Sequence, residues 1–261
     1  MSYKKAEEVL PVEIIEDRYK LYNGDCLEVM KEIADKSVDM ILCDLPYGTT
    51  ACSWDSVIPF DKLWEQYNRI IKDKGAIVLF GSEPFSSNLR MSNLKMWKYD
   101  WIWIKNKSSN FINCKYQPLK NYEFVSVFSK AASTYSKNGN MIYFPQGIIK
   151  LETPKVQKRT GNRTGEIYHS CPNNTTVQKY SNYPTLTLYY SVPSKVIHPT
   201  QKPVDLLEYL IRTYTNDNDV VLDNCMGSGS TGVACMNANR KFIGIEKDLK
   251  YFDISKERME K

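Results

Sequence analysis

The sequence predicts an α/β fold, in which one mixed sheet of seven strands is interrupted by an inserted region. Over most of the 261 residues, short apolar runs alternate with segments of helical period, as they do in α/β domains. A Gly-rich turn at residues 227–232 stands between an apolar run and a helical segment. Residues 131–196 show neither period and are rich in Pro, Gly, Asn, Ser and Thr, which is typical of a functional or disordered insertion.

Length and composition fit one large domain without a membrane span. Hydrophobic residues make up 42% of the chain, enough for a sizeable core, yet no run of 18 apolar residues occurs. The first residues, Met-Ser-Tyr-Lys-Lys-Ala, form no apolar signal segment. Seven cysteines without a Cys-x-x-Cys pair, and only two histidines, argue against a zinc site or a disulfide framework. We therefore expect a protein of the reducing cytoplasm that uses no metal.

The first half of the chain supplies five of the expected strands. The run at 38–43 is short, apolar and bounded by turn residues. Residues 100–105 and 122–129 are aromatic and β-branched, and no long helix separates them, so we expect them to pair antiparallel. Asp25 follows the first strand as an N-cap, and Glu28 would complete a capping box. The strands are expected at residues 19–24, 38–43, 76–80, 100–105 and 122–129, with helices at 60–72 and 84–96.

The last third of the chain completes the sheet. Only 29 residues follow Gly232, too few to finish a nucleotide-binding sheet, so the N-terminal half must provide the other strands. We expect the strands at 220–223 and 38–43 to lie side by side where strand order reverses, which is the ligand crevice of open α/β sheets. Pro203 is tolerated in the first turn of the helix that follows it, because its missing N–H is not needed there. The expected elements are helices at 204–215, up to about 239 and from about 251, and strands at 220–223 and 241–245.

The stretch Asp44-Leu45-Pro46-Tyr47-Gly48 directly follows the strand at 38–43. A carboxylate, free backbone carbonyls and an aromatic ring at the carboxyl end of a strand suit a planar ligand with an exocyclic amine. The carboxylate accepts one hydrogen of the amine, a carbonyl accepts the other, and the ring stacks on the ligand. A strand end followed by a simple Asp-Pro turn explains the same residues, so the motif alone does not decide between the two interpretations.

The Gly-rich turn is the second candidate site. Gly227-x-Gly229-x-x-Gly232 matches the dinucleotide fingerprint and lies between a strand and a helix. Glu246 ends the next strand, 19 residues past Gly227, where an acceptor for a ribose hydroxyl is expected. Val233 stands where a phosphate-binding Walker loop has its Lys, which excludes that loop. A tight strand–helix turn without a ligand is the alternative.

Residues 44–47 resemble the Asp-Pro-Pro-Tyr signature of DNA amino-methyltransferases, which methylate the exocyclic nitrogen of adenine or cytosine. Leu45 replaces the first Pro, but the family uses the backbone carbonyl of this position, which Leu also has. The order of an acid-Pro-Tyr motif, a variable region and a Gly-rich turn resembles the β-type arrangement of this family. The resemblance extends over roughly residues 19–260.

Further segments resemble the cofactor motifs of the same family. Residues 223–231 are similar to Asp-Pro-Phe-x-Gly-Ser-Gly-Thr-Thr, with Cys225 in place of Phe, and residues 198–203 are similar to the helix-opening cofactor segment. Residues 24–26 match a position near the cofactor adenine, and Gly244-Ile-Glu246 with Tyr251 and Arg258 resembles the part that holds the ribose. The resemblance thereby implies cofactor contacts at Asp25, Cys26, His198, Thr200, Lys202, Asp223, Gly227, Gly229, Ser230, Thr231 and Glu246.

The resemblance implies a Rossmann-like fold that uses S-adenosylmethionine. Residues 1–130 would be the catalytic half of one methyltransferase domain, 131–196 a target-recognition insertion, and 197–261 the cofactor-binding half. The implied activity is transfer of a methyl group to N6 of adenine in a specific DNA sequence, with the base flipped out of the duplex. A homodimer and a cognate restriction enzyme are possible partners.

Asp44, Leu45, Pro46 and Tyr47 would then form the catalytic set. Asp44 and the Leu45 carbonyl would polarise the amine, and Asp44 would stabilise the positive charge that develops on the nitrogen. Tyr47, helped by Trp54, would stack on the flipped base. Cys43 and Cys26 are expected to be packing residues, since methylation of an exocyclic amine needs no cysteine.

Charge points to the insertion as the DNA-binding region. The whole chain carries a net charge of +5, and residues 131–196 alone carry +6, so the remainder carries about −1. The same segment holds eight aromatic residues, and basic side chains mixed with aromatics suit a nucleic-acid backbone and unstacked bases. A solvated basic surface is the alternative. The candidate DNA contacts are Lys155, Lys158, Arg159, Arg163 and Lys179.

Other functions stay open from the sequence. Cytosine N4 is an alternative target, although Asp at position 44 favours adenine within the family. RNA or a protein amide is a further alternative substrate. An NAD-dependent oxidoreductase would use the same Gly-rich turn, but it leaves residues 44–47 and 198–203 without a role. A DNA-binding protein that has lost its activity is the last alternative, which Leu45 and Cys225 favour.

Overall fold

The computed structural model describes residues 10–15, 18–49, 55–158, 175–194 and 201–260. The chain divides into two compact units. Unit 1 comprises Met1–Phe144 and Leu186–Lys261, and unit 2 comprises Pro145–Thr185. No helix in the described part of the chain is both long and apolar enough to cross a membrane.

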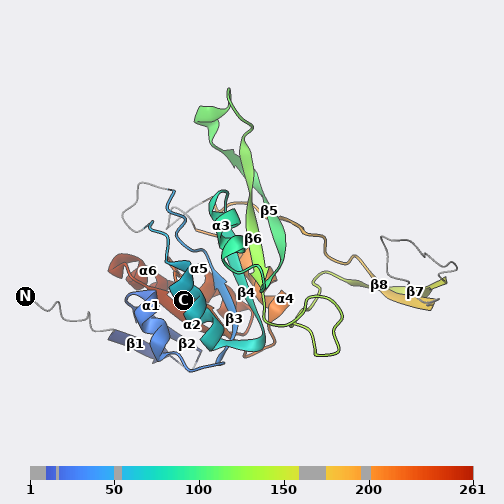
Figure 1. The fold of residues 1–261 in the computed structure, drawn as a ribbon, viewed down its shortest axis with the longest axis horizontal. Helices are drawn as coiled ribbons and strands as arrows, with labels where there is room; N and C mark the ends of the chain where they lie inside the picture. Colours follow the sequence, from blue (N-terminus) through green and yellow to red (C-terminus); the bar gives the residue numbers. More distant parts are fainter. Residues whose placement is uncertain (1–9, 16–17, 50–54, 159–174, 195–200, 261) are drawn as a thin grey trace, which may run out of the picture. The chain divides into compact units, whose positions relative to one another are not determined.

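Unit 1 is built on one mixed sheet of nine strands (Figure 1). The order across the sheet is β1-β2-β11-β10-β3-β4-β6-β5-β9. The central strands β2, β11, β10, β3 and β4 run parallel, whereas β6 is antiparallel to both β4 and β5. The strands are β1 (Leu10–Ile15), β2 (Tyr19–Asn23), β3 (Val38–Cys43), β4 (Ile71–Gly81), β5 (Trp97–Ser109), β6 (Lys120–Phe128), β9 (Thr187–Tyr189), β10 (Val220–Asp223) and β11 (Lys241–Glu246).

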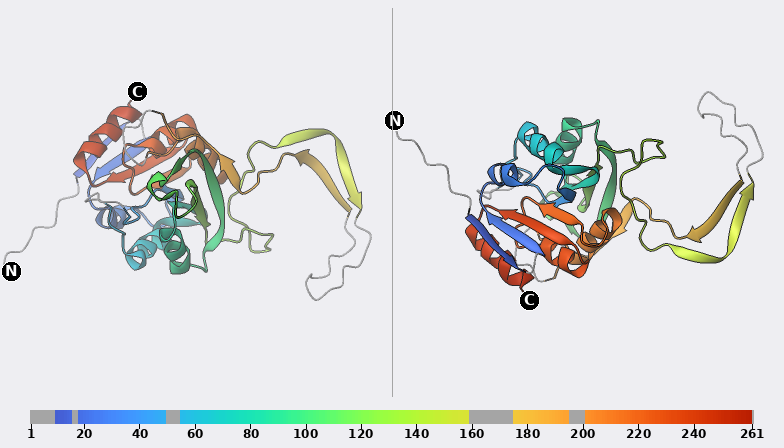
Figure 2. Two further views of the ribbon diagram at one scale, coloured as in Figure 1. Left: turned by 90° about the horizontal axis from the view of Figure 1, so that it is seen from above. Right: turned by 90° about the horizontal axis from the view of Figure 1, so that it is seen from below.

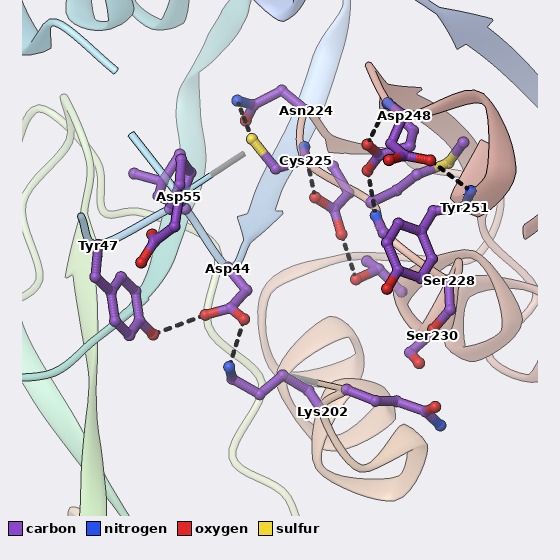
Figure 3. Close-up of a pocket in the computed structure, with 18 of the residues that line it drawn as sticks. Asp44, Tyr47, Asp55, Lys202, Asn224, Cys225, Ser228, Ser230, Asp248 and Tyr251 are labelled. Carbon is purple, nitrogen blue, oxygen red and sulfur yellow. Dashed lines mark hydrogen bonds and ion pairs between the residues drawn. The ribbon is translucent and has the colours of Figure 1, made fainter. Parts of the chain in front are cut away.

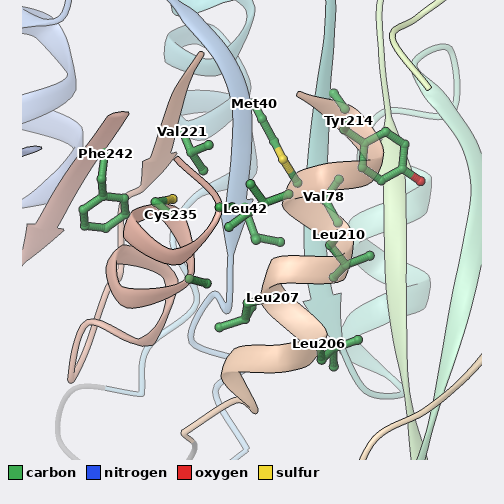
Figure 4. Close-up of a cluster of buried hydrophobic side chains, with 14 of the residues drawn as sticks. Met40, Leu42, Val78, Leu206, Leu207, Leu210, Tyr214, Val221, Cys235 and Phe242 are labelled. Carbon is green, nitrogen blue, oxygen red and sulfur yellow. The ribbon is translucent and has the colours of Figure 1, made fainter. Parts of the chain in front are cut away.

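Helices cover both faces of the sheet, the blue-to-green helices on one face and the orange-to-red helices on the other (Figure 2). Successive side chains of a strand point to opposite faces, so the wholly apolar β3 serves two cores. Met40 and Leu42 belong to the same core as residues of α4 and α5 (Figure 4), whereas Ile41 and Cys43 belong to the core that contains residues of α1, α2 and α3. The helices are α1 (Cys26–Val29), α2 (Phe60–Ile70), α3 (Phe85–Ser92), α4 (Val204–Tyr214), α5 (Ser230–Asn237) and α6 (Leu249–Met259).

All seven expected strands are present, and the sheet gains one short strand at each edge. The predicted antiparallel pairing of residues 100–105 with 122–129 is confirmed, with Ile104 opposite Tyr122. The predicted helix at 60–72 was too long, because the chain already joins β4 at Ile71. Edge strands β1 and β9 escaped the sequence analysis because short runs at a sheet edge have little apolar pattern of their own.

Caps explain two further differences. Asp25 caps α1 as expected, since its Oδ1 accepts a hydrogen bond from Leu27 N at 3.0 Å. The predicted capping box is wrong, because the Glu28 carboxylate binds Lys31 Nζ at 2.7 Å instead of reaching back to the cap. Helix α6 begins two residues earlier than predicted, since Asp248 accepts from the backbone of its first turn.

The reversal of strand order between β10 and β3 was predicted correctly. Leu222 pairs with Ile41 in parallel register, and the sheet continues from β10 to β11 on one side and from β3 to β4 on the other. Asp39 strengthens this junction, because its Oδ2 accepts from Val220 N at 3.0 Å. The loops that follow β3 and β10 therefore open over one crevice.

Unit 2 contains an antiparallel strand pair, β7 (Ile149–Lys158) and β8 (Thr175–Ser181). Val156 pairs with Val177, and both side chains are exposed. The sequence showed no period here because such a two-stranded ribbon has no buried face to impose one. The predicted insertion at 131–196 is wider than unit 2, since residues 131–144 and 186–194 belong to unit 1.

Candidate active site

Asp44 lies at the end of β3, and both of its carboxylate oxygens are hydrogen-bonded (Figure 3). Oδ1 accepts from the Tyr47 hydroxyl at 2.7 Å. Oδ2 accepts from Lys202 Nζ at 2.5 Å. Two donors from different parts of the chain thus fix the rotamer of the carboxylate, while each oxygen keeps a lone pair for a ligand.

Lys202 also lies beside Glu123, which in turn forms an ion pair with Lys105. The ammonium of Lys202 lies 3.5 Å from Glu123 Oε2, and Lys105 binds the other oxygen of Glu123. Lys202 is only 8% exposed and its Nζ stands 5.2 Å from the centre of the Phe80 ring. Two carboxylates and two ammonium groups therefore balance one another beside Asp44.

Burial and the neighbouring charges shift the pKa values of Lys202 and Glu123 in opposite directions. Burial alone would lower the pKa of Lys202, but Asp44 and Glu123 outweigh it and raise that pKa above its ordinary value. Burial would likewise raise the pKa of Glu123, but Lys202 and Lys105 hold it below its usual range. Lys202 and Glu123 are therefore both charged at neutral pH.

Tyr47 and Leu45 anchor the loop after Asp44 in different ways. The Tyr47 ring stacks on Phe85, with ring centres 4.8 Å apart and planes inclined by 27°. Leu45 is 3% exposed and packs in the apolar core beneath the loop. The buried side chain of Leu45 holds the loop in place, as the rigid ring of a proline would. Pro46, which lines the pocket, follows it.

Asp55 closes the same loop. Its Oδ1 accepts from Gly48 N at 2.8 Å and its Oδ2 from Thr49 N at 2.9 Å. Gly48 has φ +67°, a backbone conformation that glycine adopts without strain. The pocket wall after Tyr47 is thus held by a carboxylate that the sequence analysis did not single out.

The Gly-rich turn forms the other side of the crevice. Gly227 and Gly229 have φ +52° and +76°, and Asp223 supports the turn from below. Asp223 Oδ2 accepts from Thr231 Oγ1 at 2.6 Å, and its Oδ1 accepts from Cys225 N at 3.1 Å. Burial raises the pKa of Asp223 to about 6. Asp223 therefore positions the turn and its first helical residues through its own hydrogen bonds.

Helix α6 packs against the same turn and forms hydrogen bonds with it. A Cβ on Gly229 would lie 2.8 Å from Ser255 Cβ, so only glycine allows α6 to pack this closely. Arg258 Nη1 donates to the Ser228 carbonyl at 2.5 Å and to Ser230 Oγ at 3.2 Å. The sequence resemblance implied that Arg258 helps to hold a ribose, whereas its guanidinium contacts the turn itself.

Glu246 stands at the end of β11 with both oxygens engaged by backbone. Oε2 accepts from Gly227 N at 2.8 Å, and Oε1 accepts from Asp248 N at 2.8 Å. Burial raises the pKa of Glu246 above its ordinary value. Asp25, on the neighbouring strand end, is partly exposed and lies 3.3 Å from Lys247 Nζ. This side of the crevice is consequently rich in carboxylates.

Cys43 and Cys26 both pack in the apolar core beside the crevice, as expected. Cys43 is buried, and burial raises its pKa to about 12, so it stays a thiol. Cys26 is half-buried, and a hydrogen bond with Cys225 together with burial raises its pKa strongly. Neither thiol is a nucleophile at neutral pH.

One pocket of about 810 Å³ joins the two sides of the crevice. This volume is within the range of small-molecule sites. The predicted residues that line it are Asp25, Cys26, Asp44, Leu45, Pro46, Tyr47, Lys202, Asp223, Gly227, Ser230, Thr231 and Glu246. Within the part of the chain that the structure describes, no group of three or more His, Cys, Asp or Glu side chains is arranged to hold a metal ion.

Other predicted residues lie elsewhere. Gly229 is next to the pocket but shapes the turn without lining it. Lys155 and Lys179 are exposed on β7 and β8 of unit 2. His198, Thr200, Trp54, Arg159 and Arg163 lie outside the described residues, as does the side chain of Lys158.

The sequence analysis did not predict the ion pairs of Glu123 with Lys105 and Lys202. Lys105 and Glu123 occur in strands that are otherwise aromatic and β-branched, and a lone charge in such a strand was the available signal. Their pairing with Lys202 was not predictable from spacing, since about 80 residues separate Glu123 from Lys202. Trp103, Asp55 and Asp248 are further pocket residues that carried no motif.

Comparisons with known proteins agree with this geometry. A family model described as DNA methylase matches residues 38–257. The type II methyltransferase M2.MboI of Moraxella bovis is 27% identical over 272 residues, covering 92% of this chain and 87% of that protein. The DNA adenine methyltransferase YhdJ of Escherichia coli (strain K12) is 28% identical over 262 residues, covering 92% of this chain and 82% of that protein.

Solved structures give the same result for the fold. The crystal structure of an M1.HpyAVI–SAM complex superposes with a TM-score of 0.59 at 26% identity, covering 92% of this chain and 99% of that chain. The PvuII DNA methyltransferase, described as cytosine-N4-specific, superposes with a TM-score of 0.64 at 17% identity, covering 92% and 86%. The predicted α/β fold class is confirmed.

Proposed function

The chain belongs to the DNA methylase family, and from this premise we propose that it methylates N6 of adenine in a specific DNA sequence. The observation that carries the proposal is that Asp44 and the Gly-rich turn line one pocket. One side of this pocket offers acceptors for an amine, and the other offers a glycine turn between strand and helix.

The chemistry of the Gly-rich side fits S-adenosylmethionine. Asp25, Asp223, Glu246 and Asp248 line this side, so it suits a nucleoside that carries a positive charge and no phosphate. The same carboxylates would repel the pyrophosphate of a nicotinamide dinucleotide, which argues against the oxidoreductase alternative. When bound, S-adenosylmethionine supplies an electrophilic methyl group on its sulfonium.

The cofactor contacts remain proposals residue by residue. Glu246 and Asp25 end neighbouring strands and have lone pairs left for hydroxyl or amine hydrogens. Gly227 allows close approach of a ligand to the turn. The further proposed contacts are Cys26, His198, Thr200, Asp223, Gly229, Ser230 and Thr231.

The acceptor side is proposed to hold the flipped base. Asp44 and the Leu45 carbonyl would each accept one hydrogen of the exocyclic amine, whose lone pair is otherwise delocalised into the ring. This pair of acceptors draws the nitrogen toward tetrahedral geometry, and Asp44 stabilises its positive charge as the methyl group arrives. Tyr47 would stack on the base with the ring face that Phe85 does not cover.

Lys202 receives a different role from the one that the sequence implied. Its ammonium donates a hydrogen bond to Asp44 at 2.5 Å, so we propose that it holds this carboxylate in position. A cation beside a reacting nitrogen is unfavourable by itself, because that nitrogen becomes positive. Glu123, 3.5 Å from the same ammonium, offsets this charge.

Adenine is the base that the observations favour. Asp at position 44 resembles the adenine members of the family, and the similar YhdJ protein is described as an adenine methyltransferase. Cytosine N4 is the second candidate, because both amines offer two hydrogens to the same acceptors. A homodimer, a cognate restriction enzyme and a cytoplasmic location stay predictions.

Methyl transfer from labelled S-adenosylmethionine to unmethylated genomic DNA tests the proposal. Digestion to nucleosides followed by mass spectrometry identifies the product, with Asp44→Asn run in parallel. N6-methyldeoxyadenosine that the variant does not make supports the proposal. N4-methyldeoxycytidine overturns the choice of base, and cofactor binding without any DNA product overturns the choice of substrate.

A further inference from the structure

The β5–β6 hairpin carries a tip that the catalytic machinery does not use. Strands β5 and β6 pair from Trp97 opposite Phe128 to Ser109 opposite Lys120, and the turn between them includes a short 3-10 helix, Phe111–Asn113. In Figure 1 this green hairpin rises beyond the rest of the sheet. We call residues 107–120 the hairpin tip.

Three large apolar side chains of the hairpin tip face solvent. Phe111 is 75% exposed, and Ile112 and Tyr116 are each 88% exposed. Single exposed apolar residues are ordinary on protein surfaces, but three of them lie within six residues at this projecting turn. Such a patch is typical of a surface that is covered by a partner.

The hairpin tip is also basic. Lys107, Lys115 and Lys120 give it a charge of +3, and no Asp or Glu occurs between Lys105 and Glu123. Lys107 and Lys115 are exposed, whereas Lys120 donates to the Ser82 hydroxyl. Cations around stacking and wedge-forming side chains complement a nucleic acid better than a neutral protein surface.

Internal hydrogen bonds give the tip a defined shape. Asn110 has φ +69° and starts the turn, and Asn113 N donates to the Asn110 carbonyl at 3.0 Å. Cys114 N donates to the Phe111 carbonyl at 3.1 Å, and Tyr116 N donates to the Asn113 carbonyl at 2.9 Å. The apolar side chains are therefore presented by an ordered turn, which reduces the entropy lost on binding.

The end of the hairpin that lies opposite the tip forms part of the pocket wall. Trp103, Lys105 and Glu123 line the pocket, and the strands continue outward from there. At a rise of about 3.3 Å per residue, the six residues from Lys105 to Phe111 span at most roughly 20 Å. This reach equals the length of about six base pairs of duplex.

We propose that the hairpin tip contacts the DNA duplex beside the flipped base. Lys107 and Lys115 would bind phosphates, and the side chains of Phe111, Ile112 and Tyr116 would lie in a groove. This inference rests on the proposed function for the identity of the ligand. It assigns DNA contacts to unit 1, in addition to those that the sequence predicted on Lys155 and Lys179.

The charge part of the proposal is tested by the salt dependence of DNA binding. Lys107→Ala/Lys115→Ala is compared with the wild-type protein on a 30-base-pair duplex by fluorescence anisotropy across a salt series. Loss of two phosphate contacts should flatten the slope of log K against log salt by about 1.8. Lys20→Ala/Lys241→Ala is the matched control, since these exposed lysines lie at the amino ends of β2 and β11, opposite the pocket.

The apolar part is tested by Phe111→Ala/Ile112→Ala. We expect roughly tenfold weaker duplex binding with an unchanged salt slope, because truncation removes contact area and no charge. Met91→Ala/Leu94→Ala is the matched control, since these residues are exposed at the far end of α3. Calorimetry with S-adenosylmethionine and thermal unfolding should give wild-type values for all four variants, because none of these side chains is buried.

The outcomes separate this inference from the proposed function. Tip variants that bind duplex with the affinity and salt slope of the wild type overturn the inference, even where the wild type methylates DNA. Tip variants that change only the sedimentation of the protein assign the patch to a second copy of the chain and also overturn it. A wild-type protein that makes no methylated DNA overturns the proposed function, whereas the binding slopes still decide the role of the tip.

Discussion

The Gly-rich side of the pocket and the Asp44 side differ in how far apart their residues lie in the sequence. On the Gly-rich side, Asp223, Gly227 and Thr231 belong to one strand–turn–helix segment, and their hydrogen bonds run mostly within it. On the Asp44 side, Lys202 and Glu123 come from distant segments and meet only in the folded chain. Local backbone geometry builds the first side, and buried side-chain charges build the second.

The two sides of the pocket should therefore respond to different kinds of substitution. A turn that is fixed by glycine conformation responds to added bulk, whereas a balanced set of buried charges responds to loss of one member. Asp44, Lys202 and Glu123 should therefore behave as one unit whose disruption leaves the Gly-rich side intact.

Lys202→Met should give the largest loss of stability. It leaves the partly buried carboxylates of Asp44 and Glu123 without their shared cation, so the free energy of unfolding should fall by about 3 kcal/mol. Urea unfolding measures this loss, and calorimetry should show an affinity for S-adenosylmethionine within a few-fold of the wild type. Adding Glu123→Gln to the same variant should recover part of the stability, because one unpaired charge disappears.

Lys31→Met is the matched control for this prediction. Lys31 Nζ binds Glu28 Oε2 at 2.7 Å, but the two side chains are 54% and 60% exposed, so the loss should stay below about 1 kcal/mol. A Lys202→Met protein that unfolds normally yet binds the cofactor more than tenfold weaker would restore the cofactor role that the sequence implied.

Asp223→Asn should change how stability depends on pH. Burial raises the pKa of Asp223 from 3.8 to about 6, so the folded protein binds this proton more tightly than the unfolded chain. The wild-type free energy of unfolding should then fall, relative to that of the variant, by on the order of 3 kcal/mol between pH 4 and pH 7. Urea unfolding of both proteins at four pH values measures the difference, and a constant difference would contradict the raised pKa.

Gly229→Ala should show that the Gly-rich side depends on space. The new Cβ meets Ser255 Cβ at 2.8 Å in a backbone of φ +76°, so we expect a loss of about 2 kcal/mol in the free energy of unfolding. Gly139→Ala has a similar φ of +93° but meets only the flexible end of Lys74, so it should cost about 1 kcal/mol. Equal losses in the two variants would mean that α6 shifts to accommodate the side chain.

The same contrast explains what the sequence could predict. The Gly-rich turn, Glu246 and the strand junction were predictable because strand period, glycine spacing and chain order are local signals. Glu123 and Lys105 were not predicted, because their role depends on which strands β5 and β6 neighbour. The contact of Lys202 with Asp44 was not predicted for a related reason, since a motif fixes a residue type but not the group it contacts.

Two further features needed the folded chain. Leu45 departed from the first Pro of the family motif, yet its buried side chain anchors the loop to the core. The hairpin tip escaped notice because exposure of Phe111 and Ile112 cannot be derived from their apolar character. The insertion drew attention instead, because it holds eight basic residues and shows no helical or strand period.

Asp44→Asn and Glu246→Gln, compared in one experiment, test the division of the pocket most directly. Calorimetry would measure the dissociation constant for S-adenosylmethionine, and labelled transfer to unmethylated DNA at saturating cofactor would measure kcat. We predict that Asp44→Asn binds the cofactor like the wild type but loses roughly 100-fold or more in kcat. Glu246→Gln should bind it about tenfold weaker and keep kcat within a few-fold. Equal losses of affinity and kcat in both variants would contradict a pocket with two separate halves.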